Sequence, residues 1–357
     1  MFEPDEVAAL CSNTVVPHNP ELDASRYNEV QTTLNNLGLS AGLVDHWAAR
    51  HAFIAESAGK LTMLHHDPKT SIRLVGIHLD VFGFSRGAAQ ARVFCNWLQE
   101  GLLIDGKMFG VPAQVRMLGL FDTVASVGPL SSGHGDWSSS ENLRIPPESV
   151  VKNCVHFVAL HELRKNFPLE SVRVNGQLPS NCSEHVYPGS HSNVGGGYQP
   201  GEQGKAIGVM RGDGRSVRAD HLKLSQVPLN DMLQAARKTV PINAADDPWM
   251  EFQDEASPGY QAAKDLDLPR EFLLPRNTIK EVNQYFELIN IDPNLPFIEM
   301  IQAHSVAYLA WRYRLMLNKR FHTLMSVKDA AQFDPQGLEY CKKGQALLED
   351  QCKELGR

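Results

Sequence analysis

Val81-Phe82-Gly83-Phe84-Ser85-Arg86-Gly87-Ala88-Ala89 is the stretch on which the predicted fold depends. Before and into it, apolar residues recur at every second position, which is typical of a β-strand: Val75, Ile77, Leu79 and Val81. Small and helix-forming residues follow, from Ala88 through Leu98. Gly-x-Ser-x-Gly between a strand and a helix is the pattern of a sharp turn that exposes the serine hydroxyl above a sheet. The sequence therefore predicts that Ser85 is a nucleophile.

The residues around the serine have predicted roles in this turn. Gly83 and Gly87 lack the Cβ atoms that we expect to collide as the backbone folds back, and Ser85 is expected in a strained conformation. The amide of Arg86, at the start of the helix, is predicted to point toward an oxyanion formed on a substrate. Because the chain has 27 glycines, the motif alone is weak, and the flanking strand and helix carry the prediction.

Length and composition are those of a folded protein, with 357 residues, 43% hydrophobic and 21% charged. This length allows one large α/β domain with an appendage, or two domains. The net charge of −7, from 34 basic and 41 acidic residues, argues against nucleic acid as a main partner. The chain has no run of roughly 18 apolar residues, and its acidic start (1–6) lacks the basic and apolar parts of a signal peptide.

Metal and disulfide chemistry are not indicated. Position 165 is Lys, so His161-Glu162 does not continue into the metal-binding His-Glu-x-x-His pattern. The six cysteines lie far apart and include no Cys-x-x-Cys, so we interpret them as reduced thiols: Cys11, Cys95, Cys154, Cys182, Cys341 and Cys352. The sequence therefore predicts neither a metal nor a cofactor.

Two acidic residues follow predicted strands and are candidates for orienting a catalytic histidine. Asp122 comes directly after the strand-like stretch Gln114–Phe121, and a carboxylate at the carboxyl end of a strand is well placed for that role. Glu162 follows the predicted buried strand Val155–Leu160 and is the alternative acid. For Asp122, a capping role at the strand–loop junction is the plain alternative. The residues by themselves do not decide between a catalytic and a capping role for Asp122, or between Asp122 and Glu162 as the acid.

His191 is the candidate general base. It lies in a predicted loop just past the short strand Glu184–Pro188, and the glycines after it (195–197) allow close backbone approach. The chain order is then nucleophile, acid, base. His156 and His185 are interpreted instead as structural residues of their strands.

The remaining sequence predicts an α/β fold with three parts. Residues 1–70 are predicted to be a helical N-terminal segment, and 71–240 an α/β-hydrolase-like core with a mostly parallel sheet flanked by helices. Residues 241–357 are predicted to be a helical C-terminal region with a long helix over Phe297–Phe321. The Gly-rich stretch Gly201–Asp220 is predicted to be an exposed loop. The strands that normally precede the nucleophile in this fold, and the loop giving the second oxyanion donor, are expected to be missing.

Four blocks occur in an order shared with one known family: Gly-Phe-Ser-Arg-Gly-Ala-Ala (83–89), Leu-Phe-Asp-Thr-Val-Ala-Ser-Val-Gly (120–128), Ala-Leu-His-Glu-Leu-Arg-Lys-Asn-Phe-Pro-Leu (159–169) and Tyr-Pro-Gly-Ser-His-Ser-Asn-Val-Gly-Gly-Gly-Tyr (187–198). They resemble the lipolytic effectors of the bacterial type VI secretion system, specifically the branch with the Gly-Phe-Ser-Arg-Gly motif. Leu-Ser-Gln-Val-Pro-Leu-Asn-Asp-Met (224–232) and Ala-Trp-Arg (310–312) also match, so the resemblance runs from about residue 75 to 320.

The resemblance implies an α/β-hydrolase phospholipase of the A type that is delivered into rival bacteria and cleaves acyl esters of membrane phospholipids. It matches the nucleophile to Ser85, the acid to Asp122 and the base to His191, without a metal. It also implies carriage on the secretion spike or its adaptors, a cytoplasmic location in the producer before delivery, and a cognate immunity protein. The lack of a signal peptide fits that route.

The chain departs from the family pattern in two places. The family usually opens with a strand ending in Phe-Asp-Gly-Thr, which is not found here, and many relatives have Asp where this chain has Asn193. Loss of one oxyanion donor costs on the order of a hundred- to a thousandfold in turnover. Two other function classes therefore stay open: a soluble carboxylesterase or thioesterase of the same fold, and a non-catalytic fragment that binds a secretion or immunity partner.

Overall fold

The computed structural model describes residues 75–125, 143–164, 167–196, 198–199, 201–210, 214–216, 222–239 and 276–354. The predicted helical segment 1–70, and with it the expected lack of strands ahead of the nucleophile, lies outside these residues. The chain divides into two compact units. Of the described residues, 75–77 and 102–113 belong to the first unit and the others to the second.

Two tight turns shape the described part of the first unit. β2 (Leu103–Ile104) pairs antiparallel with β3 (Lys107–Met108), and β3 pairs antiparallel with the start of β4 (Val111–Phe121). Each connection has two residues, Asp105-Gly106 and Phe109-Gly110, and every one of these residues has a positive φ. Positive φ at both central positions is characteristic of type I′ turns, whose twist matches that of the strands they join.

The strands of the second unit bring their carboxyl ends to one edge. β4 pairs parallel with β5 (Cys154–Ala159), and β5 pairs parallel with β6 (Cys182–Tyr187). β1 (Ile77–Phe84) also pairs with β4. The N–H of the residue after β1 donates to the carbonyl of the last residue of β4 (3.0 Å), so these two strands end side by side. Ligands in open α/β sheets bind at such an edge.

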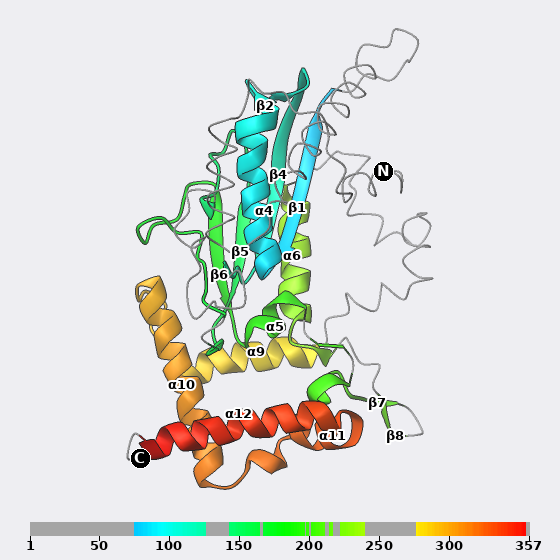
Figure 1. Ribbon diagram of the computed structural model, residues 1–357, viewed down its shortest axis with the longest axis vertical. Helices are drawn as coiled ribbons and strands as arrows, with labels where there is room; N and C mark the ends of the chain where they lie inside the picture. Colours follow the sequence, from blue (N-terminus) through cyan, green and yellow to red (C-terminus); the bar gives the residue numbers. More distant parts are fainter. Residues whose placement is uncertain are drawn as a thin grey trace, which may run out of the picture. The chain divides into compact units, whose positions relative to one another are not determined.

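Helices cover both faces of this sheet, as Figure 1 shows. α4 (Arg86–Trp97) lies on one face and α6 (Gln226–Lys238) on the other. On the α6 side, one cluster joins buried residues of strands and helices: Met117, Phe157, Ala159, Val194, Met232 and Ala236. A second cluster contains α4 residues and two loop residues: Ala89, Val93, Ala125 and Leu143. Burial of this apolar surface holds the layers together.

This architecture agrees with the α/β class, since a sheet is flanked by helices and followed by a helical region. The strand predicted over Gln114–Phe121 corresponds to β4, and the helix predicted over Ala88–Leu98 corresponds to α4. The sheet is mixed, however, whereas the sequence predicts a mostly parallel one. The difference arises from β2, β3 and the start of β4, because two-residue turns join antiparallel strands only.

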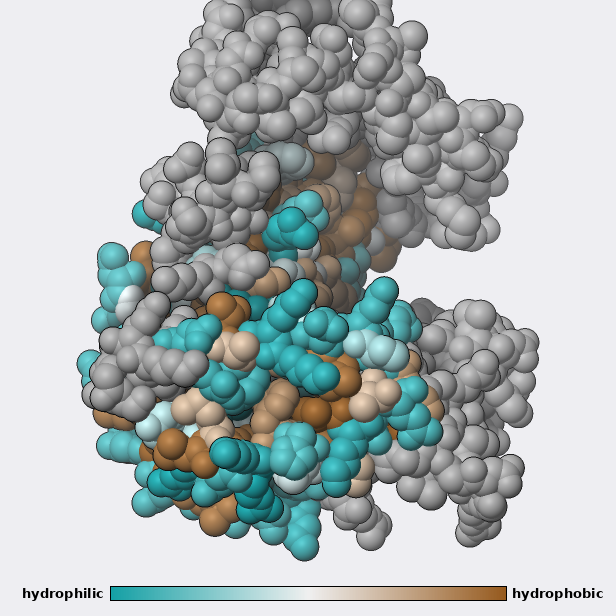
Figure 2. Space-filling model, turned by 60° about the horizontal axis from the view of Figure 1, so that its bottom comes forward, coloured by the Kyte–Doolittle hydropathy of each residue, from teal (hydrophilic) through white to brown (hydrophobic). Residues whose placement is uncertain are grey.

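The described residues after 275 are mainly helical, which agrees with a helical C-terminal region. They form α9 (Arg276–Ile289), α10 (Phe297–Leu317), α11 (Met325–Phe333) and α12 (Pro335–Glu354). The long helix ends at Leu317 rather than at Phe321, which begins a short 3-10 turn. On the face shown in Figure 2, hydrophilic and hydrophobic residues are interspersed. Within the described ranges, no helix is both long and apolar enough to cross a membrane.

The prediction of an exposed loop over Gly201–Asp220 is wrong for its first part. Gly201, Gly204, Ala206 and Ile207 are buried, and the 3-10 turn Glu202–Gly204 packs against α11. A Cβ on Gly204 would meet the backbone carbonyl of Ser326. The glycines here therefore permit close packing, which composition alone does not distinguish from flexibility. A short hairpin follows, β7 (Gly208–Met210) and β8 (Gly214–Ser216).

Candidate active site

Ser85 lies on a strained turn between β1 and α4. Its φ of 59° is in the left-handed region, which is uncommon for a residue with a side chain. The surrounding backbone holds it there, because its N–H donates to the Phe121 carbonyl (3.0 Å) and its carbonyl accepts the Val124 N–H (3.2 Å). Such strain persists only where neighbouring structure enforces it, and it is concentrated at functional sites. The expected strained conformation of Ser85 is confirmed.

The two glycines of the motif do not have the same role. A Cβ on Gly83 would collide with the backbone carbonyl of Gly87 and with Ala88 Cα, as the sequence predicts. A Cβ on Gly87 would meet no described atom within 4 Å outside its own turn of helix. The predicted collision at Gly87 is therefore wrong, because an added Cβ would have open space around it.

We expect Gly83→Ala to destabilise the fold by about 3 kcal/mol, since the added methyl group must displace backbone rather than a flexible side chain. Gly87→Ala is the matched control and is expected to change stability by less than about 1 kcal/mol, helped by the better helix propensity of alanine. Urea unfolding of both variants measures the difference. Equal midpoints for the two variants would contradict the geometry of this turn.

Ser85, His191 and Asp122 come from three different strand ends and meet in one hydrogen-bonded row. His191 Nε2 lies 2.7 Å from Ser85 Oγ, and His191 Nδ1 lies 2.7 Å from Asp122 Oδ2. Both His191 and Asp122 are 3% exposed, while Ser85 is partly exposed. A buried carboxylate, an imidazole and a reachable hydroxyl in this order can activate the hydroxyl for attack on a carbonyl.

The backbone around Asp122 fixes the direction of its carboxylate. Asp122 has a φ of 43°, and its N–H donates to the Phe157 carbonyl (2.7 Å). Its Oδ1 accepts the Ala159 N–H at 2.9 Å, which leaves Oδ2 facing His191. Asp122 is therefore tied to β5 from its main chain and its side chain at once.

His191 is the first residue of a short helix, α5 (His191–Gly195), rather than a loop residue. Ser190 caps this helix, and Asn193 Oδ1 accepts both the Ser190 N–H and the Ser190 hydroxyl, each at 3.0 Å. The Asn193 side chain thus holds the turn that leads into His191. A five-residue helix in a Gly-rich segment has little periodicity to reveal it in the sequence.

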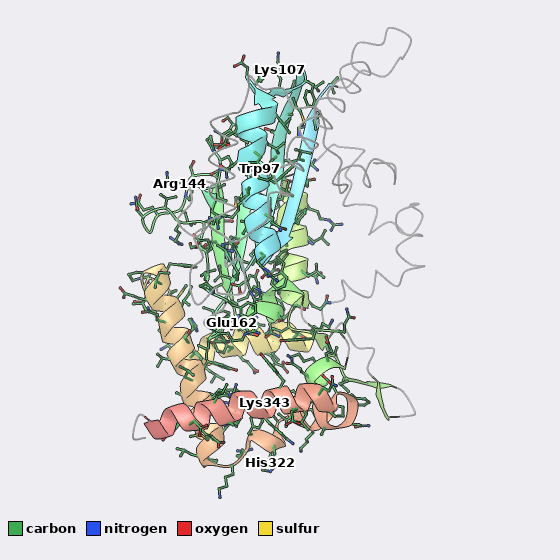
Figure 3. All side chains as sticks on the ribbon, in the orientation of Figure 1. Trp97, Lys107, Arg144, Glu162, His322 and Lys343 are labelled. Atoms are coloured by element: carbon green, nitrogen blue, oxygen red, sulfur yellow. The ribbon has the colours of Figure 1, made fainter. Side chains whose placement is uncertain are left out.

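Glu162, the alternative acid, does not reach the His191 ring. Its carboxylate accepts two hydrogen bonds from the Arg164 guanidinium (2.8 and 2.7 Å) and one from the His191 main-chain N–H (3.2 Å). Burial opposes ionisation of Glu162, but these bonds and the charge of Arg164 outweigh it and lower its pKa. Figure 3 shows Glu162 at the carboxyl end of the strands. Of the two candidate acids, the structure brings Asp122 to the imidazole.

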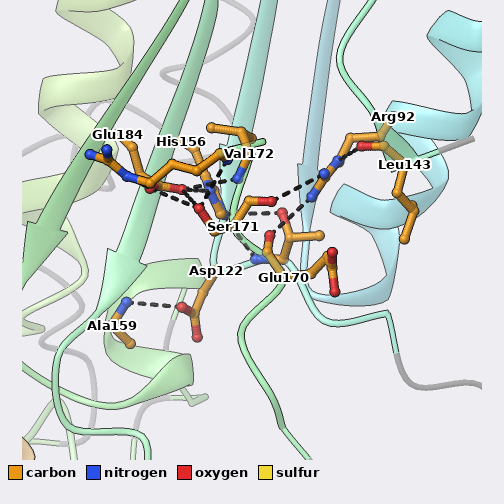
Figure 4. A network of polar contacts seen from close by, with 11 residues as sticks. Arg92, Asp122, Leu143, His156, Ala159, Glu170, Ser171, Val172 and Glu184 are labelled. Carbon is orange, nitrogen blue, oxygen red and sulfur yellow. Dashed lines mark hydrogen bonds and ion pairs between the residues drawn. The ribbon is translucent and has the colours of Figure 1, made fainter. Parts of the chain in front are cut away.

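A second carboxylate–imidazole pair supports the Asp122 loop from inside the sheet (Figure 4). His156 Nδ1 donates to Glu184 (2.9 Å), so Nε2 is free to accept the N–H of Thr123, the residue after Asp122 (3.1 Å). Both side chains of the pair are fully buried. Arg173 Nε donates to the same carboxylate at 2.9 Å, which balances its charge.

The sequence did not reveal this supporting pair. It predicts His156 as an ordinary strand residue, and no motif links it to Glu184. The two residues become neighbours only through the parallel register of β5 and β6, in which they are direct partners. A polar residue within an otherwise apolar strand is the only signal that the sequence offers.

Aromatic rings and a helix start complete the surroundings of the imidazole. The His191 ring packs against Phe84 and Phe167, with ring centroids 4.5 and 4.8 Å away. These apolar rings lower the local dielectric and so strengthen the electrostatic contacts of the site.

The N–H of Arg86 lies in the first turn of α4, where helical geometry supplies no acceptor for it. That donor is therefore available beside Ser85.

No described feature suggests a resident metal. Within the residues described, no group of three or more His, Cys, Asp or Glu side chains is arranged to hold a metal ion. Cys95, Cys154, Cys182 and Cys341 are free cysteines, and burial raises the pKa of the Cys95 thiol to about 12.

A cleft lies between β5, β6 and α6. It is lined by residues outside the Ser85–His191 contact, among them Phe157, His185 and Asp231.

Residues 104–235 match the family model described as T6SS, phospholipase effector Tle1-like, catalytic domain. This match supports the family of type VI secretion lipolytic effectors. The matched Tle1-like segment includes Asp122 and His191, while Ser85 precedes it. No curated protein matches the chain.

Solved structures that are similar to this chain include these two. One is the crystal structure of an uncharacterized protein from Pseudomonas aeruginosa, which is 32% identical with a TM-score of 0.57. That match covers 77% of this chain and 36% of the other. The second is the Tle1 effector bound to the VgrG spike from the type 6 secretion system, 32% identical, covering 45% of this chain and 33% of the other with a TM-score of 0.29. The chain thus spans about a third of the length of these structures.

Proposed function

We propose that the protein is a serine carboxylic ester hydrolase in which Ser85 is the nucleophile, His191 the general base and Asp122 the acid. The observation that carries this proposal is the pair of 2.7 Å contacts from Ser85 Oγ to His191 and from His191 to Asp122. The strained turn at Ser85 and the buried, aromatic surroundings of His191 support it.

The proposed reaction has two steps. In the first, Ser85 Oγ attacks the ester carbonyl while His191 Nε2 takes its proton, and Asp122 stabilises the resulting imidazolium. The Arg86 N–H donates to the oxyanion of the tetrahedral intermediate. His191 then returns the proton to the departing alcohol, and the acyl group stays on Ser85. In the second step, water attacks this acyl ester by the same proton transfers and releases the fatty acid.

The substrate we propose is a membrane glycerophospholipid, cleaved at an acyl ester as by a phospholipase A, and the departing alcohol is then a lysophospholipid. The match to the Tle1-like catalytic domain and the resemblance of the four sequence blocks support this substrate class. The same resemblance supports delivery into target bacteria on the secretion spike or an adaptor, and a cognate immunity protein in the producing cell.

Fatty-acid release from phosphatidylethanolamine or phosphatidylglycerol vesicles tests the substrate, and labelling by a fluorophosphonate tests the nucleophile. We expect the probe to modify Ser85, identified by peptide mass spectrometry, and hydrolysis to rise sharply when a short-chain lipid passes from monomers to aggregates. Hydrolysis without that rise would favour a soluble carboxylesterase or thioesterase. A folded protein with neither labelling nor hydrolysis would favour a non-catalytic role in binding a secretion or immunity partner.

A further inference from the structure

His161 joins the end of β5 to the loop that leads into His191. Its main-chain N–H donates to the Gly189 carbonyl, and the Gly189 N–H donates to His161 Nδ1, each at 2.9 Å. Gly189 lies two residues before His191. Its φ is 113°, and a Cβ there would collide with the side chains of Asn193 and Leu224. His161 therefore clamps a closely packed piece of backbone next to the proposed base.

The hydrogen bonds of His161 fix its tautomer and continue into the C-terminal helices. Because Nδ1 accepts a backbone proton, the ring proton lies on Nε2, which donates to the Tyr285 hydroxyl at 2.7 Å. Tyr285 then donates its own proton to His304 Nδ1 at 2.6 Å. We call this series, from Gly189 through His161 and Tyr285 to His304, the positioning chain.

Burial keeps the positioning chain neutral. It lowers the pKa of His161 to about 4, with a further contribution from the charge of His304, and it also lowers the pKa of His304. Burial raises the pKa of Tyr285 to about 12. Near neutral pH all three side chains are therefore uncharged, and their hydrogen bonds do not depend on salt as surface ion pairs do.

Ring contacts hold two C-terminal helices against the end of β5. His161 stacks on Tyr308, with centroids 5.1 Å apart and planes at 18°, and meets Tyr285 edge to face at 5.1 Å. Ser305 Oγ donates to the carbonyl of the residue before His161 (3.3 Å). His304, Ser305 and Tyr308 come from α10 and Tyr285 from α9. Figure 1 shows α9 crossing beside the carboxyl ends of the strands.

We propose that Tyr285 and His304 are positioning residues for the reaction at Ser85, acting through His161 and Gly189. In this view, α9 and α10 help to hold the His191 imidazole at its 2.7 Å distance from Ser85. Misplacement of a catalytic group by about 1 Å costs on the order of a hundredfold in rate. Because the positioning chain is one of several supports of this loop, we expect its loss to cost about tenfold. The kinetic part of this inference rests on the proposed function.

Tyr285→Phe tests the chain with the smallest change, since it keeps the ring and removes the hydroxyl that both histidines share. We expect kcat on a monomeric ester to fall about tenfold with KM within about twofold, because a positioning role affects the chemical step rather than binding. Tyr313→Phe makes the same change on α10 outside the positioning chain and is expected to leave both constants unchanged.

Two substitutions at His304 separate hydrogen bonding from packing. His304→Asn retains an acceptor oxygen near the position of Nδ1, whereas His304→Leu retains only bulk. We expect the Asn variant to keep nearly wild-type kcat and the Leu variant to lose about tenfold. Equal kcat in the two variants, both shown to be folded by thermal melting, would overturn the proposal.

Amide hydrogen exchange of the segment 187–195 gives a readout that needs no activity. We expect faster exchange in Tyr285→Phe and His304→Leu, and wild-type exchange in Tyr313→Phe and His304→Asn. Unchanged exchange in all four variants would overturn the positioning role. The two proposals can fail separately. If the wild-type protein neither hydrolyses esters nor reacts at Ser85, the proposed function is refuted. If the four variants still show the expected exchange pattern in that case, the positioning chain stands.

Discussion

Ser85→Ala is expected to release fatty acid from phospholipid vesicles only at a residual rate, on the order of a millionth of the wild-type rate. The variant keeps the turn but removes the oxygen that forms the acyl intermediate, and loss of such a nucleophile lowers kcat on the order of a millionfold. Ser85 Oγ is also the atom 2.7 Å from His191 Nε2, so the base loses its proton donor. Scintillation counting of labelled fatty acid released from vesicles covers the required range.

The matched control for this change is Ser183→Ala, on the amino-terminal half of β6. It removes the same hydroxyl from a residue outside the proposed triad and is expected to keep wild-type release. Substantial release by a folded Ser85→Ala variant would exclude the acyl-enzyme mechanism. Fluorophosphonate labelling of the two variants gives a second reading, because only the control retains the expected target.

Asp122→Asn is expected to lower kcat about ten-thousandfold while leaving the fold intact. The Asn oxygen can still accept the Ala159 N–H, but its amide then points a donor at His191 Nδ1. That donor favours the tautomer with the proton on Nε2, which cannot accept the Ser85 proton. Steady-state kinetics on a monomeric ester, with circular dichroism as a check of folding, measures the loss.

Glu162→Gln is the comparison that distinguishes the two candidate acids. The Gln oxygen can still accept the His191 main-chain N–H, while the ion pair with Arg164 is lost. We expect a fall in kcat of about tenfold or less, since Glu162 holds the backbone of His191 rather than its ring. A larger loss for Glu162→Gln than for Asp122→Asn would reverse the assignment of the acid.

Much of the α/β region can be predicted because its signals are local. The alternating strand before Ser85, the helix after it and the strand ending at Phe121 each follow from neighbouring residues. Prediction from sequence fails where the same local pattern is compatible with two structures, as a Gly-rich stretch is with an exposed loop or with close packing. Glycines suggest an exposed loop over Gly201–Asp220, yet Gly204 lies against the Ser326 backbone. A helix as short as α5 has too few residues to show a period.

The residues of the candidate site also divide into those that local sequence patterns predict and those that only the tertiary structure brings together. The sequence predicts Ser85 from its motif and His191 from its place after a strand, but local patterns do not choose between Asp122 and Glu162, and only the family resemblance favours Asp122. Both follow buried strands, and the choice depends on which carboxylate reaches a ring that is distant along the chain. His156 and Glu184 become partners only through strand register, and Tyr285 meets His161 across 124 positions.

What the sequence determines by itself is the order of strands and helices and the kinds of side chain at the strand ends, because backbone propensity and the hydrophobic pattern act over a few residues. Only the tertiary structure decides which of those side chains touch: Asp122 rather than Glu162 on His191, and α9 and α10 on the loop beside it. Hydrogen bonds of 2.6 to 2.9 Å require atoms to be placed by the packing of several elements at once, and no single stretch of chain contains that information.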